Sequence, residues 1–315
     1  MSETKQSLPT PGELLKKSFS LYFSHFKIFL GILVIPVALV FLIIVLGVVG
    51  QIVFWGTISG ALLTIVIMFA AAVSLIAGGV SYLALFDAVI EGGQPQGGVR
   101  GAWIKAWHMF VPFAWIGILT MLCVLGGYVF FIIPGMIIGV WLSLAIFSLV
   151  AEGRHGLNAL AASWHYVKGY WWAVFWRLCV SGIVAFIIAS ILNVFNPQNG
   201  IIHQSLVSSL IYLFLSLIFG FTVQPTLGVI YPYYIYQSLR EVKSSYPIEE
   251  DAPKLKKEII AFAAMGIIAL VAMFALIIAL FSNEVNKQRS SPTYDFPAIS
   301  TSSLSATQNT TSSLR

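Results

Sequence analysis

Charged side chains are the scarcest class in this sequence. Asp, Glu, Lys and Arg make up 9% of its 315 residues, whereas a soluble domain carries about 25%. Hydrophobic residues make up 58%, so a soluble fold would lack the polar side chains needed to cover its surface. The composition therefore predicts an integral membrane protein. The net charge of +5 is then attributed to the membrane topology and not to nucleic-acid binding.

Cysteine and catalytic motifs are also scarce. The two cysteines, Cys123 and Cys179, lie in apolar runs, so the sequence predicts neither a disulfide framework nor a cysteine metal site. The five histidines lack the spacing of a zinc site, and no nucleophile elbow, phosphate loop or dinucleotide motif occurs. We therefore expect no catalytic residue, no cofactor and no metal. A metal site assembled from separate helices and a membrane-embedded enzyme are the alternatives.

Ionisable side chains are missing from the centres of the apolar runs. Asp87 lies at the end of one run, and Arg177 lies near the start of another. Ion-coupled transport commonly relies on carboxylates or broken helices at mid-membrane, so this pattern counts against it. Pro36 and Gln224-Pro225 can open local kinks, although membrane helices tolerate proline without any functional role.

Long apolar runs are what the sequence has in abundance. A helix needs about 20 apolar residues to cross the hydrocarbon of a bilayer. Seven stretches are apolar over roughly that length, at residues 28–50, 62–86, 111–132, 136–151, 173–194, 206–231 and 259–281. The predicted fold class is an all-α integral membrane protein with seven transmembrane helices.

Pro134 and Gly135 interrupt a long uncharged tract. Residues 109–151 would form about 64 Å of helix at 1.5 Å per residue, which is too long for one crossing and suits two. Proline lacks an amide donor, and glycine tolerates positive φ. Pro134-Gly135 is therefore predicted to form a turn between two antiparallel spans. A kink in one long helix is the alternative.

The basic residues indicate the orientation of the chain. The connections near 51–61, 128–135 and 195–205 contain no charged residue, whereas 14 of the 17 Lys and Arg residues lie on the opposite side of the predicted spans. The positive-inside bias then places the N-terminus in the cytoplasm and the C-terminus outside. We expect a multi-pass protein of the cell (cytoplasmic or inner) membrane.

Three segments of the chain share one plan. Aligning Phe19, Trp103 and Trp164 brings further aromatic residues into register, and each segment leads into a pair of spans. Each pair ends with an aromatic residue five positions before a glutamate, as in Phe86 and Glu91, Phe147 and Glu152, and Tyr236 and Glu241. We interpret this plan as three repeats of an amphipathic interfacial helix followed by a transmembrane hairpin. Chance agreement is the alternative.

The repeats divide the chain into four regions. Residues 1–243 form the predicted six-span membrane domain, and 244–258 form a charged cytoplasmic linker. Residues 259–281 form the seventh transmembrane helix. The Ser/Thr-rich tail 282–315 has little apolar content and is predicted to be disordered, because it cannot bury enough surface to fold.

Aromatic and basic side chains gather on the three amphipathic segments. Thr10, Pro11 and Glu13 match a capping box with proline at the first helical position. Aromatic rings favour the depth of the lipid headgroups, and lysine stems reach water from there. We therefore expect these helices to lie along the cytoplasmic interface. The predicted lipid contacts are Phe19, Lys17, Trp103, Trp107, Lys105, Trp164, Lys168, Trp171 and Trp172. The alternative is that these helices only anchor and orient the bundle.

The order of these motifs resembles a known family. The segments "LLKKSFSLYFSHFKIFL", "IIPGMIIGVWLSLAIFSLVAEG" and "GLNALAASWHYVKGYWWAVFWRL" are similar to the bacterial membrane domain that is fused to some glycerophosphoryl diester phosphodiesterases and that also occurs alone. The resemblance covers residues 10–245 and implies a bacterial inner-membrane protein. The chain has apolar residues 137–144 where members often carry an arginine. The fused enzyme is a separate barrel that nothing in this chain resembles, so its hydrolase activity is not carried over.

The functional expectation is a non-enzymatic membrane protein that binds lipid, organises the membrane or assists a partner. The alternative is a transporter or channel for a small or lipid-like solute, because three helix–hairpin units could surround a cavity. The expected partners are membrane lipids, and a membrane-protein partner or a second copy of the chain are further candidates. No nucleic-acid partner is expected.

Overall fold

The computed structural model of the protein describes residues 8–54, 58–196, 199, 205–243 and 248–290. Within these ranges all the secondary-structure elements are helices. Seven helical segments are long and apolar enough to cross a membrane. The predicted all-helical chain with seven segments of spanning length is therefore confirmed. The chain divides into two units, residues 1–269 and 270–315, and the contacts described below all belong to the first.

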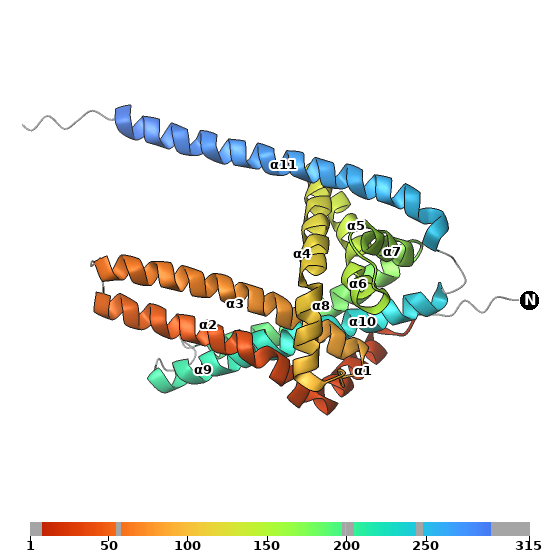
Figure 1. The fold of residues 1–315 in the computed structure, drawn as a ribbon, viewed down its shortest axis with the longest axis horizontal. Helices are drawn as coiled ribbons and strands as arrows, with labels where there is room; N and C mark the ends of the chain where they lie inside the picture. Colours follow the sequence, from red (N-terminus) through yellow and green to blue (C-terminus); the bar gives the residue numbers. More distant parts are fainter. Residues whose placement is uncertain (1–7, 55–57, 197–198, 200–204, 244–247, 291–315) are drawn as a thin grey trace, which may run out of the picture. The chain divides into compact units, whose positions relative to one another are not determined.

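The helices follow one another with short connections (Figure 1). In chain order they are α1 (Pro11–Ser24), α2 (Phe26–Phe54), α3 (Ile58–Ile90), α4 (Gly98–Phe130), α5 (Ile132–Leu142), α6 (Ala145–Glu152), α7 (Leu157–Val167), α8 (Trp171–Val194), α9 (Leu206–Ile218), the π-helical turn η2 (Phe219–Val223), α10 (Gln224–Val242) and α11 (Ile248–Ser290).

Helix α1 begins where the sequence predicts. The amide of Glu13 donates to Thr10 Oγ1 at 3.4 Å, and the amide of Thr10 donates to the Glu13 carboxylate at 3.2 Å. The predicted capping box is therefore confirmed. Leu14, Ser18 and Tyr22 form the buried face of the helix, and α1 packs against α10. This contact places the N-terminal helix against the sixth candidate span.

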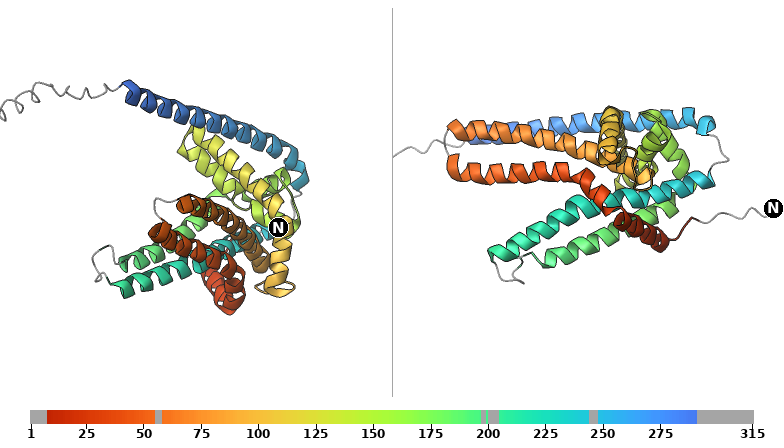
Figure 2. Two further views of the ribbon diagram at one scale, coloured as in Figure 1. Left: turned by 60° about the vertical axis from the view of Figure 1, so that its left-hand side comes forward. Right: turned by 60° about the horizontal axis from the view of Figure 1, so that its bottom comes forward.

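Pro36 frees a carbonyl that joins three helices. Because proline has no amide hydrogen, the carbonyl of Ile32 one turn earlier lacks its helical donor. The Ser81 hydroxyl donates to this oxygen at 3.1 Å, and the Trp103 indole donates to it at 3.3 Å. One carbonyl in α2 is thereby bound by α3 and α4. Helices α2 and α3 lie side by side as a hairpin (Figures 1 and 2).

Pro134 and Gly135 lie inside α5 and not in the turn that precedes it. The chain reverses at Phe131, which has extended φ and ψ of 172° and 170° and separates α4 from α5. The predicted break between two paired helices is therefore present, but its assignment to Pro134-Gly135 is wrong. A proline in the first turn of a helix loses no hydrogen bond, because the amides there have no helical acceptor. A Cβ on Gly127 would lie 2.8 Å from the Cα of Gly135, so these glycines allow α4 and α5 to approach closely.

The fourth candidate span is made of two helices. Helix α5 ends at Leu142, and α6 begins at Ala145. The hydroxyl of Ser163 in α7 donates to the carbonyl of Trp141 at 2.7 Å and accepts from the amide of Leu144 at 3.1 Å. One serine therefore satisfies a donor and an acceptor that the break leaves without helical partners.

The three predicted amphipathic helices differ in the structure. Helix α1 is separate from the span that follows it, whereas residues 98–110 continue without a break into α4. Helix α7 is buried from Ala159 to Val167, so its prediction as an interfacial helix is wrong. Its Trp164 stacks on Trp141 of α5, with ring centroids 4.3 Å apart. The apolar stripe of α7 thus packs against protein.

The beginning of α11 covers part of this buried region. Leu255, Ile259 and Ala263 are buried in the same cluster as Trp164, at a spacing of four residues that marks one helical face. The predicted linker 244–258 is therefore helical over its described part, 248–258. The predicted tail has helical residues as far as Ser290, and 291–315 lie outside the described residues.

The aromatic residues that the repeat assigned to equivalent positions meet in the core. The rings of Phe86 and Phe147 have centroids 4.8 Å apart, and those of Phe147 and Tyr236 are stacked at 5.6 Å. All three side chains are buried. The ends of α3 and α10 therefore converge on α6 through these rings.

Candidate functional site

The predicted lipid contacts occupy several kinds of position. Trp107 and Trp172 are 61% and 74% exposed, and Lys17 and Lys168 are exposed as well. These four side chains can reach a surrounding membrane. Trp164 is only 4% exposed, so its predicted contact with lipid is wrong.

The remaining predicted contacts are occupied by the protein itself. Phe19, Trp103 and Trp171 are half-buried. The indole of Trp171 donates to the carbonyl of Ile137 at 3.2 Å, as that of Trp103 does to Ile32. Lys105 forms an ion pair with buried Asp87, and its ammonium lies 3.1 Å from the Glu91 carboxylate. Lys105 therefore serves mainly to neutralise acidic groups at the end of α3.

Glu152 is the centre of a second polar cluster at the helix ends. Its Oε1 accepts hydrogen bonds from the hydroxyls of Tyr166, at 2.7 Å, and Tyr236. Its Oε2 accepts from Arg154 at 2.7 Å. Burial and the hydrogen bond to Glu152 raise the pKa of Tyr166, so this hydroxyl remains protonated as a donor. The partners satisfy one another, and the cluster joins α6, α7 and α10 without offering an open reactive group.

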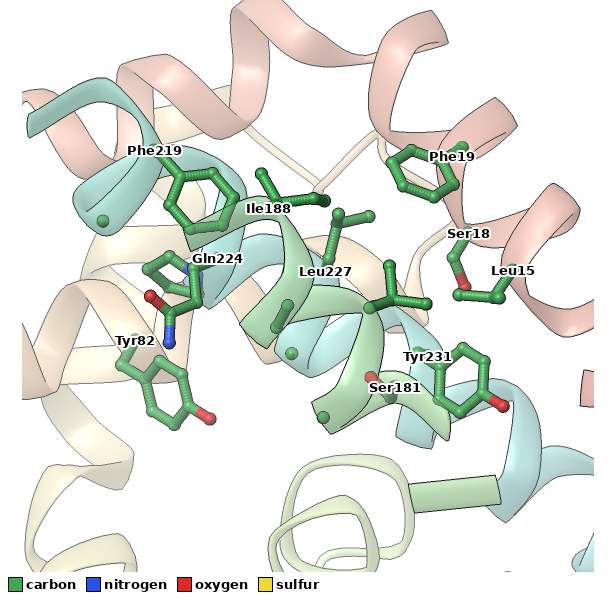
Figure 3. Close-up of a pocket in the computed structure, with 16 residues that line it drawn as sticks. Leu15, Ser18, Phe19, Tyr82, Ser181, Ile188, Phe219, Gln224, Leu227 and Tyr231 are labelled. Carbon is green, nitrogen blue, oxygen red and sulfur yellow. The ribbon is translucent and has the colours of Figure 1, made fainter. Parts of the chain in front are cut away.

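A cavity of about 420 Å³ is lined by several polar side chains. We call it the hydroxyl cavity (Figure 3). Its walls come from α1, α3, α8, η2 and α10. The polar side chains that line it are Ser18, Tyr82, Ser181, Gln224 and Tyr231, and the other lining residues are Leu15, Phe19, Gly182, Val184, Ala185, Ile188, Phe219, Gly220, Pro225, Leu227 and Gly228. No charged residue lines it.

Four of these polar groups lack a hydrogen-bond partner in the part of the chain that the structure describes. They are the hydroxyls of Tyr82, Ser181 and Tyr231 and the amide of Gln224; Tyr231 is buried, Tyr82 and Ser181 are partly buried, and Gln224 is exposed. Tyr231 is 1% exposed, and its hydroxyl is fully buried. A buried hydroxyl without a partner costs about 1–3 kcal/mol. The Tyr231 hydroxyl is therefore a buried polar group of the cavity wall that no protein atom satisfies among the described residues.

The π-helical turn η2 contributes to the shape of the hydroxyl cavity. In η2 the amide of Gln224 donates to the carbonyl of Phe219, five residues earlier, so the helix is locally widened. Such turns inside α-helices are rare and are frequent at functional sites. Pro225 follows directly and contributes no donor. The glycines Gly182 and Gly228 have open space where a Cβ would project, which leaves the walls recessed.

A second cavity of about 440 Å³ adjoins the first. We call it the apolar cavity. It shares Tyr82 and Pro225 with the hydroxyl cavity, and its other lining residues are Leu33, Pro36, Val40, Ile43, Ala71, Ser74, Leu75, Gly78 and Phe221. No charged side chain lines it either. Both volumes are within the roughly 300–1,000 Å³ of typical ligand pockets.

The apolar cavity lies at the middle of two candidate spans. It uses residues 33–43 of the span Phe26–Gly47 and residues 71–82 of the span Leu62–Ile90. The hydroxyl cavity uses Leu15 and Ser18 of α1, which lies before the first span. It also uses residues 181–188 of the span Trp171–Val194 and residues 219–231 of the span Val207–Val242, so both cavities lie near the middle of candidate spans.

Only part of this site was predicted from the sequence. Gln224-Pro225 indicated a local kink in the sixth span, and the kink is present as η2 followed by α10. Phe19 was predicted as a lipid contact and lines the hydroxyl cavity. Ser181, Gly182 and Tyr231 were missed, because their significance depends on which helices pack together.

A third cavity of about 620 Å³ has charged residues in its lining, Lys17 and Glu241. Among the described residues no three His, Cys, Asp or Glu side chains are grouped to hold a metal. Comparisons with known protein families, curated proteins and solved structures give no match to this chain. The functional argument therefore depends on the geometry of the two cavities.

Proposed function

We propose that this protein is a non-enzymatic multi-pass membrane protein that binds a lipid in the hydroxyl and apolar cavities. The single observation that carries the proposal is the group of unpartnered polar side chains beside a cavity with apolar walls. A water-filled polar site would lack the apolar walls, and a dry apolar site would lack the unpartnered polar side chains. A lipid contains a polar and an apolar half in one molecule.

The proposed location supports this function. Seven helical segments of spanning length and the one-sided distribution of basic residues favour the cell membrane, with the N-terminus in the cytoplasm and the C-terminus outside. Residues 33–43 and 71–82 would then lie within the hydrocarbon. A lipid could enter the apolar cavity from the bilayer without crossing water.

We also propose that the first six spans derive from three repeats. The contacts among Phe86, Phe147 and Tyr236 support this arrangement, since residues at equivalent positions in a symmetric unit tend to meet at its centre. These rings fill the space between the hairpin ends. We therefore favour a binding function over the alternative of a transporter with a central pathway.

The test uses the full chain purified in a mild detergent from membranes. Lipid that remains bound is measured by native mass spectrometry for the parent protein and for Gly228→Leu. Gly228 lines the hydroxyl cavity and has open space at its Cβ position, so leucine fills the cavity without displacing protein atoms near the backbone. We expect the parent protein to retain lipid and Gly228→Leu to retain at most about one tenth as much, the loss that corresponds to about 1.4 kcal/mol.

Gly117→Leu is the matched control. Gly117 is also helical, also has open space at its Cβ position and lines neither cavity. It should retain lipid as the parent does. If all three proteins retain the same amount of lipid, or if none retains any, the proposed function is wrong.

A further inference from the structure

The two cavities together specify the chemistry of their occupant. We propose that they bind an uncharged amphiphile, with a hydroxyl- or ester-bearing head group in the hydroxyl cavity and one acyl chain in the apolar cavity. This inference rests on the proposed lipid-binding function and assigns the class of lipid. It also assigns each part of the lipid to one of the two cavities.

The shared residues connect the two chambers. Tyr82 and Pro225 line both cavities, so one molecule can extend from one to the other past these side chains. Figure 3 shows Tyr82 and Gln224 on one side of the hydroxyl cavity and Ser181 and Tyr231 on the other. A head group placed between these pairs would have its chain directed past Tyr82.

The absence of charge in the lining selects against charged head groups. No Asp, Glu, Lys or Arg lines either cavity, and an ionised group in an apolar site needs a counter-ion. Arg177 is one helical turn before Ser181 on α8. Its guanidinium already donates to the carbonyls of Leu8, Pro9 and Ala173, at distances of 2.7–3.0 Å. Four of its five donor hydrogens are thereby engaged, so Arg177 has one donor left for a phosphate or carboxylate.

The unpartnered groups also select for a mixed head group. The hydroxyls of Tyr82, Ser181 and Tyr231 both donate and accept, and the amide of Gln224 offers two donors and an acceptor. Hydroxyl and ester groups provide the complementary set without charge. Ser18 donates to the carbonyl of Leu14 at 2.8 Å, so its oxygen can still accept a hydrogen bond from the ligand.

The two cavities lie at similar depth, since the hydroxyl cavity also uses the middle of the fifth and sixth candidate spans. The hydroxyl cavity borders α1, and the apolar cavity lies at the middle of the first two spans. The lining, and not the depth, therefore assigns the head group to the hydroxyl cavity and the acyl chain to the apolar cavity. Transfer of the acyl chain from detergent or lipid into the apolar cavity exchanges one apolar environment for another and contributes little to binding. Specificity must therefore come from the head group.

The experiment measures binding of radiolabelled monooleoylglycerol to the full chain in detergent. Its head group carries two hydroxyls and one ester, and its single chain fits the proposed arrangement. Unlabelled oleate and oleoyl-lysophosphatidylcholine compete as probes with the same chain and a charged or zwitterionic head group. We expect both competitors to be at least about tenfold weaker than unlabelled monooleoylglycerol, which corresponds to the 1.4 kcal/mol of one decade in affinity.

Four variants test the position of the ligand. Gly228→Leu fills the hydroxyl cavity, and Gly78→Leu fills the apolar cavity, where a Cβ also has open space. Each should weaken monooleoylglycerol binding at least about tenfold, whereas Gly117→Leu should bind like the parent. Tyr231→Phe should weaken binding about 2- to 10-fold, the equivalent of one hydrogen bond, without lowering the stability of the ligand-free protein, since it removes a buried unpartnered hydroxyl.

The outcomes separate this inference from the proposed function. If oleate or lysophosphatidylcholine binds as tightly as monooleoylglycerol and is lost in Gly228→Leu, the protein binds lipid but the assigned head-group class is wrong. If Gly78→Leu binds like Gly117→Leu, the two-chamber arrangement is wrong. If none of the three lipids binds the parent protein, both this inference and the proposed function fail.

Discussion

The tyrosines that bind Glu152 allow a quantitative test of the helix packing. Tyr166 and Tyr236 both donate to Oε1 of this carboxylate, and both side chains are at least 95% buried. The Arg240 guanidinium is 3.9 Å from the same oxygen, too far for a hydrogen bond. A hydrogen bond to a charged group contributes about 1.5–3 kcal/mol.

The shared oxygen determines the magnitude of each effect. In Tyr166→Phe or Tyr236→Phe, Oε1 keeps one donor, so each substitution should lower the free energy of unfolding by about 1.5 kcal/mol. In the double variant a buried charged oxygen has no hydrogen bond. The decrease in the free energy of unfolding of the double variant should therefore exceed the sum of the two single decreases by about 1 kcal/mol or more, as is typical of residues in one network.

The assay is reversible unfolding by titration from a mild detergent into SDS, followed by circular dichroism. Tyr212→Phe is the matched control, because Tyr212 is only half-buried and makes no hydrogen bond among the described residues. It should change the free energy of unfolding by less than about 0.5 kcal/mol. The reasoning is refuted if Tyr236→Phe costs no more than Tyr212→Phe, or if the double variant shows no coupling.

Three further predictions concern the packing of α4, α5 and α7. Ser163→Ala should cost about 1–3 kcal/mol in the same titration, because it leaves the Trp141 carbonyl and the Leu144 amide without their partner; an unchanged midpoint would contradict this. Gly127→Ala should cost about 1–3 kcal/mol through overpacking against Gly135, whereas Gly117→Ala should be neutral or stabilising by up to about 1 kcal/mol; equal effects would remove the argument for close helix approach. Trp164→Ala should cost about 3–5 kcal/mol, and Trp172→Ala, at a 74% exposed position, should cost much less; the reverse order would show that α7 is not buried.

Local features of the fold could be predicted from the sequence. The capping box at Thr10 depends on residues three positions apart, and the break after residue 130 depends on the length of one apolar tract. Both are present, although the break is at Phe131 and Pro134-Gly135 lie in the next helix. Proline in a first helical turn loses no hydrogen bond, so its presence near a break does not identify the turn residue.

Features that depend on helix packing could not be predicted. The aromatic stripe of α7 has the pattern of an interfacial helix, yet Trp164 is covered by Trp141 of α5 and by Phe262 of α11. An apolar helical face packs equally well against lipid or protein, and the sequence pattern alone does not distinguish the two. The cavities were missed for the same reason, since Ser181 and Tyr231 acquire a common role only when α8 and α10 lie together.

The most direct test of lipid binding is an electron cryomicroscopy map of the full chain in nanodiscs that contain monooleoylglycerol. We predict continuous elongated density that begins between Gln224 and Tyr231, passes Tyr82 and Pro225, and ends between Pro36 and Gly78, and this density should be absent in Gly228→Leu. A map that resolves the side chains around both cavities but shows them collapsed, or without density where annular lipids are clearly visible, would contradict the account.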